Sequence, residues 1–413
     1  MNNSQPVRCL FVTSIFPPIN GGSAVVYENL CRYAPNGTMM VLASWRDYAT
    51  GKPIENWKEL DNAAPYSVER IELLRPISIQ SKSKLHSLWL LVTQDLPLKA
   101  KVLYKAVEII KARNVNVICI GELTAGSWLG LLCRWLFGCK IINYIHGEEI
   151  TTRMNYLFYG KNRKFYLRKA DAIVAVSQFT RNALIDIMEV NPIKIHVNEN
   201  GVDTKRFFPG VKKDAILKRH KIEGKRILLT VGRLVQRKGI DKTLQALPEI
   251  IKKIPNIHYL IVGSGEFQPN LETIVKELAL ENFVTFAGRI AEEDLVKYYQ
   301  SCDLFVMPNR ELADHDTEGF GLVFLEANAC KKAVIGGRAG GAVEAISHGK
   351  TGLLVDGNNP EEIASAIIEL LTDETKRKEI EETGYQYALN ANWESKAHRF
   401  YELCNNLLKE TAQ

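Results

Sequence analysis

The sequence has no apolar run long enough to cross a membrane as a helix. Its longest uncharged apolar run covers residues 123–133, whereas a membrane-spanning helix needs about 18 apolar residues. Near the amino terminus, a strand-like pattern follows Met1 to Arg8 without the apolar region of a secretion signal. We therefore expect a cytoplasmic protein, and we expect any membrane contact to be peripheral, at the inner face.

The sequence also lacks the cysteine spacing of a zinc site. No C-x-x-C pair is present, and several cysteines lie inside apolar strand or helix patterns. We therefore expect reduced core residues at all eight cysteine positions, which are 9, 31, 119, 133, 139, 302, 330 and 404.

Three short motifs resemble known ligand sites, but each is incomplete or out of place. Gly349-Lys-Thr351 has Glu344 where a P-loop has its first glycine. Gly263-Ser-Gly265 lacks the third glycine of a dinucleotide fingerprint. Asp314-His-Asp316 has the spacing of a D-x-D metal motif, but it lies in a loop leading into Glu318. We expect no metal and no cofactor.

Basic residues gather in the first half of the chain. Its 413 residues, of which 46% are hydrophobic, suffice for two large cores. Residues 1–200 hold 24 Lys and Arg against 16 Asp and Glu, and the rest holds 29 against 31, so the halves carry +8 and −2. This difference indicates an anionic partner for the first half, or it is a property of a solvated surface. Nothing indicates a nucleic acid.

Strand-like and helical patterns alternate along the first half, which predicts a parallel sheet covered on both faces. Residues 45–66 and 75–95 have no clear period and are expected to form long surface loops. The expected strands are 7–13, 38–43, 68–73, 115–120, 140–145, 171–176 and 193–197, and the expected helices are 23–33, 97–113, 123–137, 160–169 and 177–188.

A second series begins after the turn residues of Asn200–Pro209. We expect an amino-terminal domain at 1–200, a second domain at 201–390, and a terminal helix at 391–413 that packs back on the first. The expected strands are 226–231, 258–262, 283–286, 303–306, 333–335 and 352–355, and the helices are 240–252, 268–279, 291–301, 320–330, 360–371, 374–390 and 393–409.

The stretch from Glu318 to Ile335 combines a glycine loop, an apolar helix and a buried strand. Gly319 and Gly321 let the backbone approach a ligand, and the helix start attracts an anion. Glu318 and Glu326 are eight residues apart, which in one helix is about 12 Å of rise and about 80° of rotation, so both carboxylates are expected on one side of a ligand. A ligand that offers a phosphate to the helix start and hydroxyls to the carboxylates is a sugar nucleotide. Glu326 considered alone is also consistent with a residue of an ordinary core helix.

The octapeptide Gly232–Gly239, which reads GRLVQRKG, follows a predicted strand and precedes a helix. This position puts Arg233 and Lys238 at the carboxyl edge of the second sheet, where open α/β sheets bind ligands. Two cations with this spacing suit a diphosphate, or they form a solvated basic loop. Their pairing with the stretch around Glu318 favours the diphosphate.

These two motifs resemble those of the retaining, GT-B-fold glycosyltransferases of family four, which include glycogen synthase-like and phosphatidylinositol mannosyltransferase-like enzymes. The resemblance covers nearly the whole chain. It implies that Arg233 and Lys238 bind the donor diphosphate, that Glu318 contacts the transferred sugar, and that Glu326 holds the ribose. The backbone amides implied to hold the sugar hydroxyls and the phosphate are those of Gly319, Phe320, Gly321 and Leu322.

Three further loops take part in the resemblance. Gly21 and Gly22 resemble the loop that closes over the phosphates, and Arg289 and Ile290 resemble the strand end that frames the nucleobase. His146 matches the family's His-Gly loop, which implies a place near the sugar between the two domains, although a lone histidine is more often structural.

The resemblance implies two facing Rossmann-like, doubly wound domains and a metal-independent, retaining hexosyltransferase. The donor would be a nucleotide sugar, and the loop at 308–317 favours GDP-mannose over UDP-sugars. The acceptor would be a glycan or a lipid-linked hydroxyl. The alternatives are a nucleotide-sugar 2-epimerase of the same architecture and a non-catalytic sugar-nucleotide-binding protein. The presence of all four charged donor residues favours transfer.

The helical stretch 97–113 is basic and amphipathic. A helix of this composition is suited to lie on an anionic membrane surface, or its basic face is an ordinary solvated one. Together with the charge of the first half, it leads us to expect an anionic acceptor, and contact with an anionic membrane. The basic positions are Lys99, Lys101, Lys105, Lys111 and Arg113, and the apolar ones are Leu98, Val102, Leu103, Val107 and Ile110.

Overall fold

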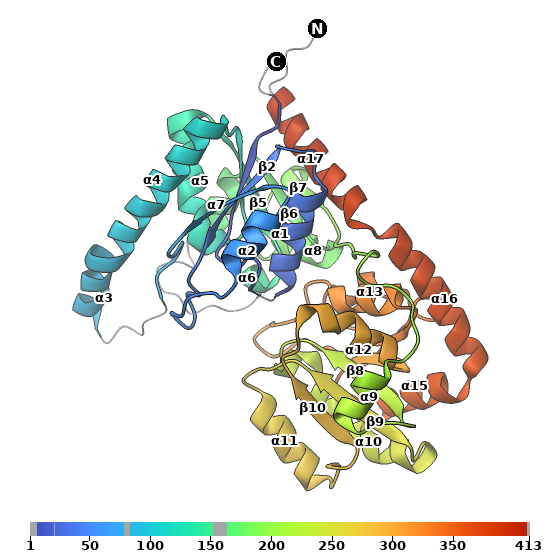
Figure 1. The fold of residues 1–413 in the computed structure, drawn as a ribbon. Helices are drawn as coiled ribbons and strands as arrows, with labels where there is room; N and C mark the ends of the chain where they lie inside the picture. Colours follow the sequence, from blue (N-terminus) through green and yellow to red (C-terminus); the bar gives the residue numbers. More distant parts are fainter. Residues whose placement is uncertain (1–5, 20, 78–82, 152–162, 411–413) are drawn as a thin grey trace.

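The computed structural model describes residues 6–19, 21–77, 83–151 and 163–410. In this part of the chain, each half forms one parallel sheet with helices on both faces, and two long carboxy-terminal helices run along both halves (Figure 1). The predicted pair of Rossmann-like sheets is therefore confirmed.

The first sheet has the strand order β3-β2-β1-β4-β5-β6-β7, and each neighbouring pair is parallel. Its central strands are almost wholly buried, as expected for a sheet covered on both faces. The strands are β1 (Cys9–Val12), β2 (Met39–Ser44), β3 (Ser67–Ile71), β4 (Val117–Ile120), β5 (Lys140–Ile145), β6 (Ala172–Ala175) and β7 (Ile195–Val197).

Helices from both ends of the chain cover one face of this sheet. Phe400 of α17 (Trp393–Lys409) contacts Phe11 and Tyr144 of the sheet, and Tyr27 of α1 (Gly22–Tyr33) contacts the same two rings. The opposite face is covered by α4 (Leu96–Arg113), α5 (Leu123–Phe137), α7 (Arg163–Lys169) and α8 (Gln178–Asp186).

The second sheet repeats this plan, with the order β10-β9-β8-β11-β12-β13 and parallel pairs throughout. In both sheets the order reverses beside the first strand of the half, between β1 and β4 and between β8 and β11. Open α/β sheets bind ligands at such a point. The strands are β8 (Arg226–Val231), β9 (Ile257–Val262), β10 (Val284–Gly288), β11 (Leu304–Met307), β12 (Ala333–Gly337) and β13 (Leu353–Val355).

Two sets of helices pack on the second sheet. One face carries α10 (Ile240–Lys253), α11 (Gln268–Glu277) and α15 (Pro360–Thr372). The other carries α12 (Leu295–Ser301), α13 (Leu322–Ala329) and α16 (Glu374–Asn390). Short helices α9 (Asp214–His220) and α14 (Ala342–Ala345) lie in connections that the sequence patterns did not predict as helical.

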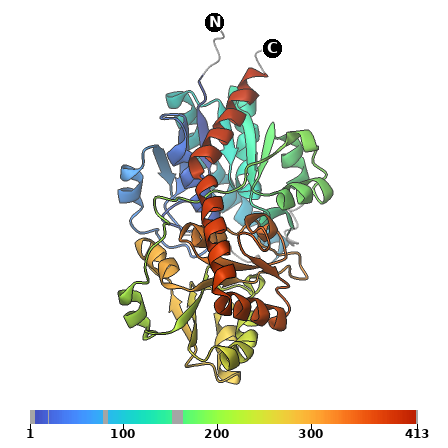
Figure 2. The same ribbon diagram turned by 90° about the vertical axis from the view of Figure 1, so that its right-hand side faces the viewer.

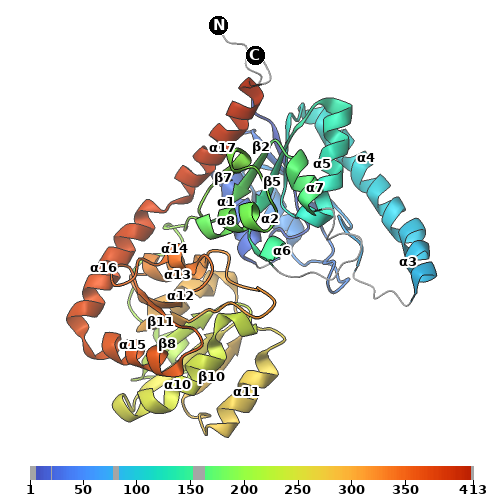
Figure 3. The same cartoon turned by 180° about the vertical axis from the view of Figure 1, so that it is seen from behind.

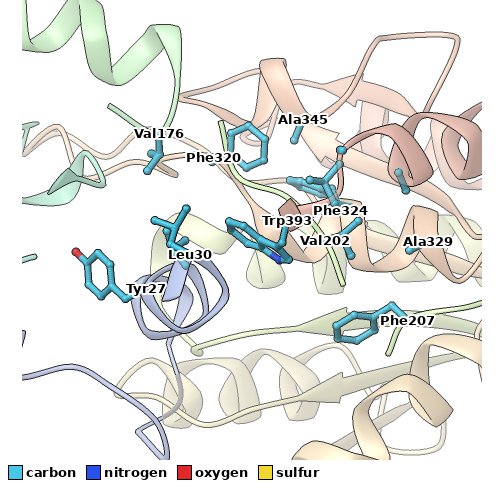
Figure 4. Close-up of a cluster of buried hydrophobic side chains, with 14 of the residues drawn as sticks. Tyr27, Leu30, Val176, Val202, Phe207, Phe320, Phe324, Ala329, Ala345 and Trp393 are labelled. Atoms are coloured by element: carbon cyan, nitrogen blue, oxygen red, sulfur yellow. The ribbon is translucent and has the colours of Figure 1, made fainter. Parts of the chain in front are cut away.

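The chain crosses between the halves twice, and the two crossings lie side by side. The N–H of Val202 donates to the carbonyl of Ala391 over 2.8 Å, and a Cβ on Gly201 would lie 2.9 Å from that same oxygen. Trp393 is buried here in an apolar core that continues from one half into the other (Figure 4). From this point α17 returns to the first sheet, as predicted (Figure 2). The division into domains at residues 200 and 390 stays a prediction.

Two stretches predicted as loops contain helices instead. Residues 45–66 include α2 (Trp57–Ala63), and residues 75–95 include α3 (Lys84–Leu90) and a π-helical turn at Leu91–Asp95, although 78–82 lie outside the described residues. The π-helical turn ends two residues before Pro97, whose ring and missing N–H disfavour a regular helix. Ser83 caps the start of α3, and its hydroxyl accepts the N–H of His86.

The prediction that the apolar face of residues 97–113 could lie on a membrane is wrong. Val102, Ile109 and Ile110 of α4 are buried against the first sheet, together with Leu10 and Ile118. The hydrophobic periodicity of this helix is satisfied inside the protein. A cluster of exposed apolar side chains lies one element earlier, on α3 and the π-helical turn.

All eight cysteines are free and buried, as predicted. Among the described helices, none combines the length and apolarity needed to cross a bilayer.

Candidate donor site at the junction of the two halves

Two loops meet at the carboxyl edge of the second sheet, at its reversal point. Residues 232–239 follow β8, and residues 308–321 follow β11. Lys238 Nζ lies 2.6 Å from Glu318 Oε2, and both side chains are nearly buried. The structure therefore brings together two of the predicted site residues that are 80 positions apart.

The charge of Glu318 is set by its neighbours. Burial by itself raises the pKa of this carboxyl, but the positive charges of Lys238 and Arg237 outweigh burial. The pKa of Glu318 is therefore below its usual value, and the carboxylate stays ionised at neutral pH. It can accept hydrogen bonds from hydroxyl groups, which is the property that contact with a sugar requires.

Glu318 and Glu326 do not share a helix, contrary to the predicted geometry. Gly321 has φ +88°, and α13 begins only at Leu322, so the predicted helix 320–330 starts two residues late. Glu326 accepts a hydrogen bond from the hydroxyl of Tyr299 over 2.6 Å. Burial raises the pKa of Glu326 above its usual value, although the bond from Tyr299 acts in the opposite direction.

Glycines hold the backbone of the Glu318 loop in place. The N–H of Gly341 donates to the Glu318 carbonyl over 2.7 Å. A Cβ on Gly340 would lie 2.3 Å from that carbonyl oxygen, and one on Gly341 would lie 2.0 Å from the Gly319 oxygen. These turns after β12 therefore accept only glycine without rearrangement.

Two further ion pairs join the Glu318 loop to the loop 232–239 and to the first turn of α10. Arg310 binds both oxygens of Asp241 at 2.9 and 2.8 Å, and Arg237 binds Asp316 at 3.1 Å. Asp314 accepts the N–H of Asp316 over 3.2 Å. The two carboxylates of the D-x-D motif thus have partners within the protein, and no group of three or more potential metal ligands occurs among the described residues.

Arg233, Arg289 and Ile290 lie near the same edge of the sheet. The N–H of Leu234 donates to the Ser264 carbonyl over 3.1 Å, and Arg289 donates to the Ser264 hydroxyl over 2.8 Å. The Gly263–Gly265 turn therefore joins the loop that carries Arg233 to the loop that carries Arg289 and Ile290.

Residues of the first half meet the second half at Gly319. A Cβ on Gly319 would lie 2.0 Å from the carbonyl oxygen of His146, and one on Gly22 would lie 3.7 Å from Leu322 Cδ1. Gly21 directly precedes α1 in extended backbone. The structure thus brings His146, Gly21 and Gly22 to the loop that carries Glu318, Gly319, Phe320, Gly321 and Leu322.

A further contact joins the halves beside this point. The carboxylate of Glu344 accepts the N–H groups of Gln178 and Phe179 at 2.6 and 2.7 Å, which are the first amides of α8. A carboxylate at a helix start is favoured by the exposed amides and the helix dipole. Glu344 therefore caps a first-half helix from the second half.

Several side chains of the site were missed from the sequence. Arg237 lies one position before Lys238 but was not singled out, and Tyr299 and Tyr27 lie within ordinary amphipathic helix patterns. Glu344 was noted only as the residue that excludes a P-loop. The basic octapeptide held a signal for Arg237, whereas the other three gain their roles from contacts distant in sequence.

Two family models match the chain. Residues 212–387 match the model described as Glycosyl transferases group 1, and residues 67–206 match the one described as Glycosyltransferase Family 4.

Curated relatives cover most of the chain. The GDP-mannose-dependent alpha-(1-6)-phosphatidylinositol monomannoside mannosyltransferase of Mycolicibacterium smegmatis is 32% identical over 71% of this chain and 78% of its own length. The GDP-mannose-dependent monoacylated alpha-(1-6)-phosphatidylinositol monomannoside mannosyltransferase of Corynebacterium glutamicum is 27% identical over 94% of each chain.

Solved structures match the fold. The Anabaena protein HepE, in complex with UDP and glucose, has a TM-score of 0.75 and 21% identity over 96% of this chain and 99% of its own. This likeness confirms the predicted two-sheet GT-B architecture.

The contact at Gly319 yields a stability prediction. In Gly319→Ala the added Cβ would overlap the His146 carbonyl oxygen, so the two halves must separate locally. Overpacking of this kind costs about 1–3 kcal/mol. We expect a lower midpoint in thermal unfolding followed by circular dichroism.

Gly22→Ala is the matched control at the same junction. Its Cβ would make an ordinary contact with Leu322, and alanine favours a helix over glycine by up to about 1 kcal/mol. The midpoint should stay unchanged or rise. Equal losses in both variants would mean that the backbone contact at Gly319 is not the constraint inferred here.

Proposed function

The chain belongs to the group 1 glycosyltransferases, and we propose that it transfers a mannosyl group from GDP-mannose, with retention of configuration, to a hydroxyl of a lipid-linked, anionic acceptor. The observation that carries this proposal is the arrangement around Glu318, which pairs with Lys238 while the adjacent Gly319 rests on the backbone of His146. A sugar held by the second half would meet an acceptor held by the first at this junction.

The second half has the groups that a departing diphosphate needs. Transfer breaks the bond between the anomeric carbon and a diphosphate oxygen, forms a bond to the acceptor oxygen, and releases the hydroxyl proton. Lys238, Arg233 and the first amides of α13 would stabilise the charge that develops on the diphosphate. Glu326 has one oxygen bonded to Tyr299, so the other would accept a ribose hydroxyl.

The donor and the stereochemistry rest on the curated relatives. Both mannosyltransferases are named as GDP-mannose-dependent, both names contain the term alpha-(1-6), and they match 71% and 94% of this chain. The mannosyl group of GDP-mannose is itself α-linked, so an α product corresponds to retention. HepE was crystallised with UDP and glucose, which supports a nucleoside diphosphate as the general ligand class.

Two other functions remain distinguishable by experiment. A nucleotide-sugar 2-epimerase would convert its donor without an acceptor, and a sugar-nucleotide-binding protein would convert nothing. Transfer is favoured because Arg233, Lys238, Glu318 and Glu326 are all present and Lys238 and Glu318 meet.

We place the enzyme at the cytoplasmic face of an anionic membrane. The eight free, buried cysteines suit a reducing compartment. Both relatives have a phosphatidylinositol derivative in their names, which is an anionic lipid acceptor. The first half carries the excess of basic residues, so an anionic acceptor and an anionic surface would both be attracted to it.

The element that would contact the membrane is the arm formed by α3 and the π-helical turn. It extends away from the first sheet at the level of the junction (Figures 1 and 3). Apolar side chains are exposed at helical spacing along this arm, and such a cluster is unusual on the surface of a soluble protein. They are Leu85 (80% exposed), Leu88 (57%), Trp89 (57%) and Val92 (54%), and the exposed Leu96 (52%) follows at the start of α4.

The basic residues after this arm contribute unequally. Lys101 is exposed and Lys99 lies over the ring of Trp128, whereas Lys105 is paired with Glu69 at 3.0 Å. We therefore expect apolar insertion of the arm to provide most of the binding, with Lys99 and Lys101 adding about 1 kcal/mol each near an anionic surface.

Lys238→Ala tests the assignment of the diphosphate site. Loss of one preorganised donor costs about 3 kcal/mol of transition-state stabilisation, so kcat/KM should fall about 100-fold. The measurement is transfer of labelled mannose from GDP-mannose to a phosphatidylinositol mannoside, with UDP-glucose as a parallel donor that the wild type should use poorly. Arg233→Ala should behave in the same way.

Lys252→Ala is the matched control, because this exposed lysine of α10 pairs with Glu249 on its own helix. Its rate should equal that of the wild type. Near-normal turnover of Lys238→Ala would overturn the assignment.

Activity should also be independent of divalent metal. Lys238, Arg233 and the helix amides would supply the positive charge, and Asp314 and Asp316 have partners within the protein. The rate in excess EDTA should therefore match the untreated rate. A loss that Mg²⁺ or Mn²⁺ restores would contradict this prediction.

Vesicle sedimentation tests the arm. The wild type should bind vesicles containing phosphatidylinositol more than neutral phosphatidylcholine vesicles, and less strongly at high salt, because screening weakens the attraction. The double variant Leu88→Ser, Trp89→Ser should lose most binding to both.

Trp135→Ser is the control, since this α5 tryptophan is also 80% exposed but lies outside the arm. It should bind vesicles as the wild type does. Absence of wild-type binding, or equal and salt-insensitive binding to both vesicles, would leave a soluble acceptor as the conclusion. An equal loss in both variants would exclude the arm as the contact.

A further inference from the structure

The ring of His146 has one hydrogen-bond partner among the described side chains, the hydroxyl of Tyr27. Nε2 of His146 lies 2.8 Å from the Tyr27 oxygen, and that oxygen lies 2.7 Å from the carbonyl oxygen of Gly121. A carbonyl oxygen can only accept a hydrogen bond, so the single hydroxyl proton of Tyr27 is donated to Gly121. The hydroxyl oxygen must then accept from Nε2, which places the ring proton on Nε2.

The position of this proton also determines the role of the other ring nitrogen, Nδ1. Burial lowers the pKa of His146 to about 4, so the imidazole is neutral at physiological pH and carries one proton. Because that proton is on Nε2, Nδ1 has a free lone pair and acts as an acceptor. Within the described residues, no donor lies at Nδ1. A hydroxyl-bearing ligand could donate to it.

Packing prevents the side chains of Tyr27 and His146 from rotating. Tyr27 is fully buried, and Gly121 has no room for a Cβ, which would lie 2.8 Å from the tyrosine ring. The ring of Tyr144 lies against that of His146, with centroids 5.4 Å apart. The backbone N–H of His146 donates to Glu149 over 2.8 Å. The ring is therefore held by contacts from α1, β5 and the start of α6 (Glu148–Thr151).

The backbone of the residue that carries this ring lies at the donor loop. The carbonyl of His146 is the group on which Gly319 rests, and Glu318 directly precedes that glycine. Tyr27 is at the first-half end of the continuous core (Figure 4). One tyrosine thus links the core of the first half to a histidine at the junction.

We propose that Tyr27 is a positioning residue that holds His146 as the neutral Nε2–H tautomer, so that Nδ1 accepts a hydrogen bond from a hydroxyl of the transferred sugar. The role of Nδ1 rests on the proposed function, whereas the tautomer does not. With the opposite tautomer, Nδ1 would carry the proton. It would then donate to the oxygen of that hydroxyl and could not accept the hydroxyl's proton.

The tautomer is measured directly by ¹⁵N NMR of the donor-free, histidine-labelled protein at neutral pH. His146→Gln identifies the signal, and the wild type should show the Nε2–H form. In Tyr27→Phe the ring loses its acceptor, so the signal should move toward a mixture of both tautomers. Because the change removes one neutral hydrogen bond, kcat/KM should fall about 10-fold.

Tyr144→Phe is the matched control. It removes the hydroxyl of the other tyrosine whose ring lies against that of His146. Within the described structure this hydroxyl is not hydrogen-bonded to the imidazole, so the tautomer should be unchanged. An Nδ1–H signal in the wild type, or the same pure tautomer in wild type and Tyr27→Phe, would overturn the proposal. If Tyr27→Phe fails to fold, the wild-type spectrum alone decides. A confirmed tautomer without sugar transfer would overturn the proposed function and leave the positioning role of Tyr27 intact.

Discussion

The structure depends on the absence of a side chain at Gly319. Here the loop that leads into α13 lies directly on the carbonyl of His146, at a separation that any Cβ would reduce to 2.0 Å. The contact joins a loop after β11 to a loop after β5, so it sets how the two sheets face each other. Glycines 340 and 341 hold the same loop from behind. A ligand bound to the second half, as proposed, would therefore face the first half across a backbone contact, which varies less than a contact between side chains.

Charge at this junction is nearly balanced before any ligand binds. Lys238 pairs with Glu318, Arg237 with Asp316, and Arg310 with Asp241. A buried cation without a partner would cost several kcal/mol, so these pairs keep the empty site stable. A diphosphate bound at Lys238, as proposed, would share that lysine with Glu318. The released oxygen of Glu318 would then be able to accept sugar hydroxyls, so the proposed site would couple recognition of the phosphate to recognition of the sugar.

Much of this arrangement could be predicted from the sequence, because the signals were local. The bounds of β8, α16 and α17 agree with the expected ranges, since strong apolar patterns and turn residues delimit them. The octapeptide 232–239 and the Glu318 loop were predicted to lie together, and they do. The shared helix of Glu318 and Glu326 was wrong because Gly321 adopts a left-handed conformation that delays the helix. Composition does not reveal whether a glycine adopts such a conformation.

The remaining errors have one cause. Hydrophobic periodicity shows that a helix has an apolar face, but it does not show what that face contacts. The apolar face of α4 was predicted to contact a membrane and instead packs on the first sheet. The residues of α3 were not predicted to form a helix, and the apolar face of that helix is uncovered in the described structure.

The same difficulty hid the support of His146, because Tyr27 and Phe400 read as ordinary core residues of helices at opposite ends of the sequence. In the fold, Phe400 packs on Tyr144, and Tyr144 packs on the histidine ring. The last helix is therefore part of what orients a group at the junction. The carboxy-terminal helix thus fills one face of the first sheet and, through Phe400 and Tyr144, also supports the histidine ring from behind.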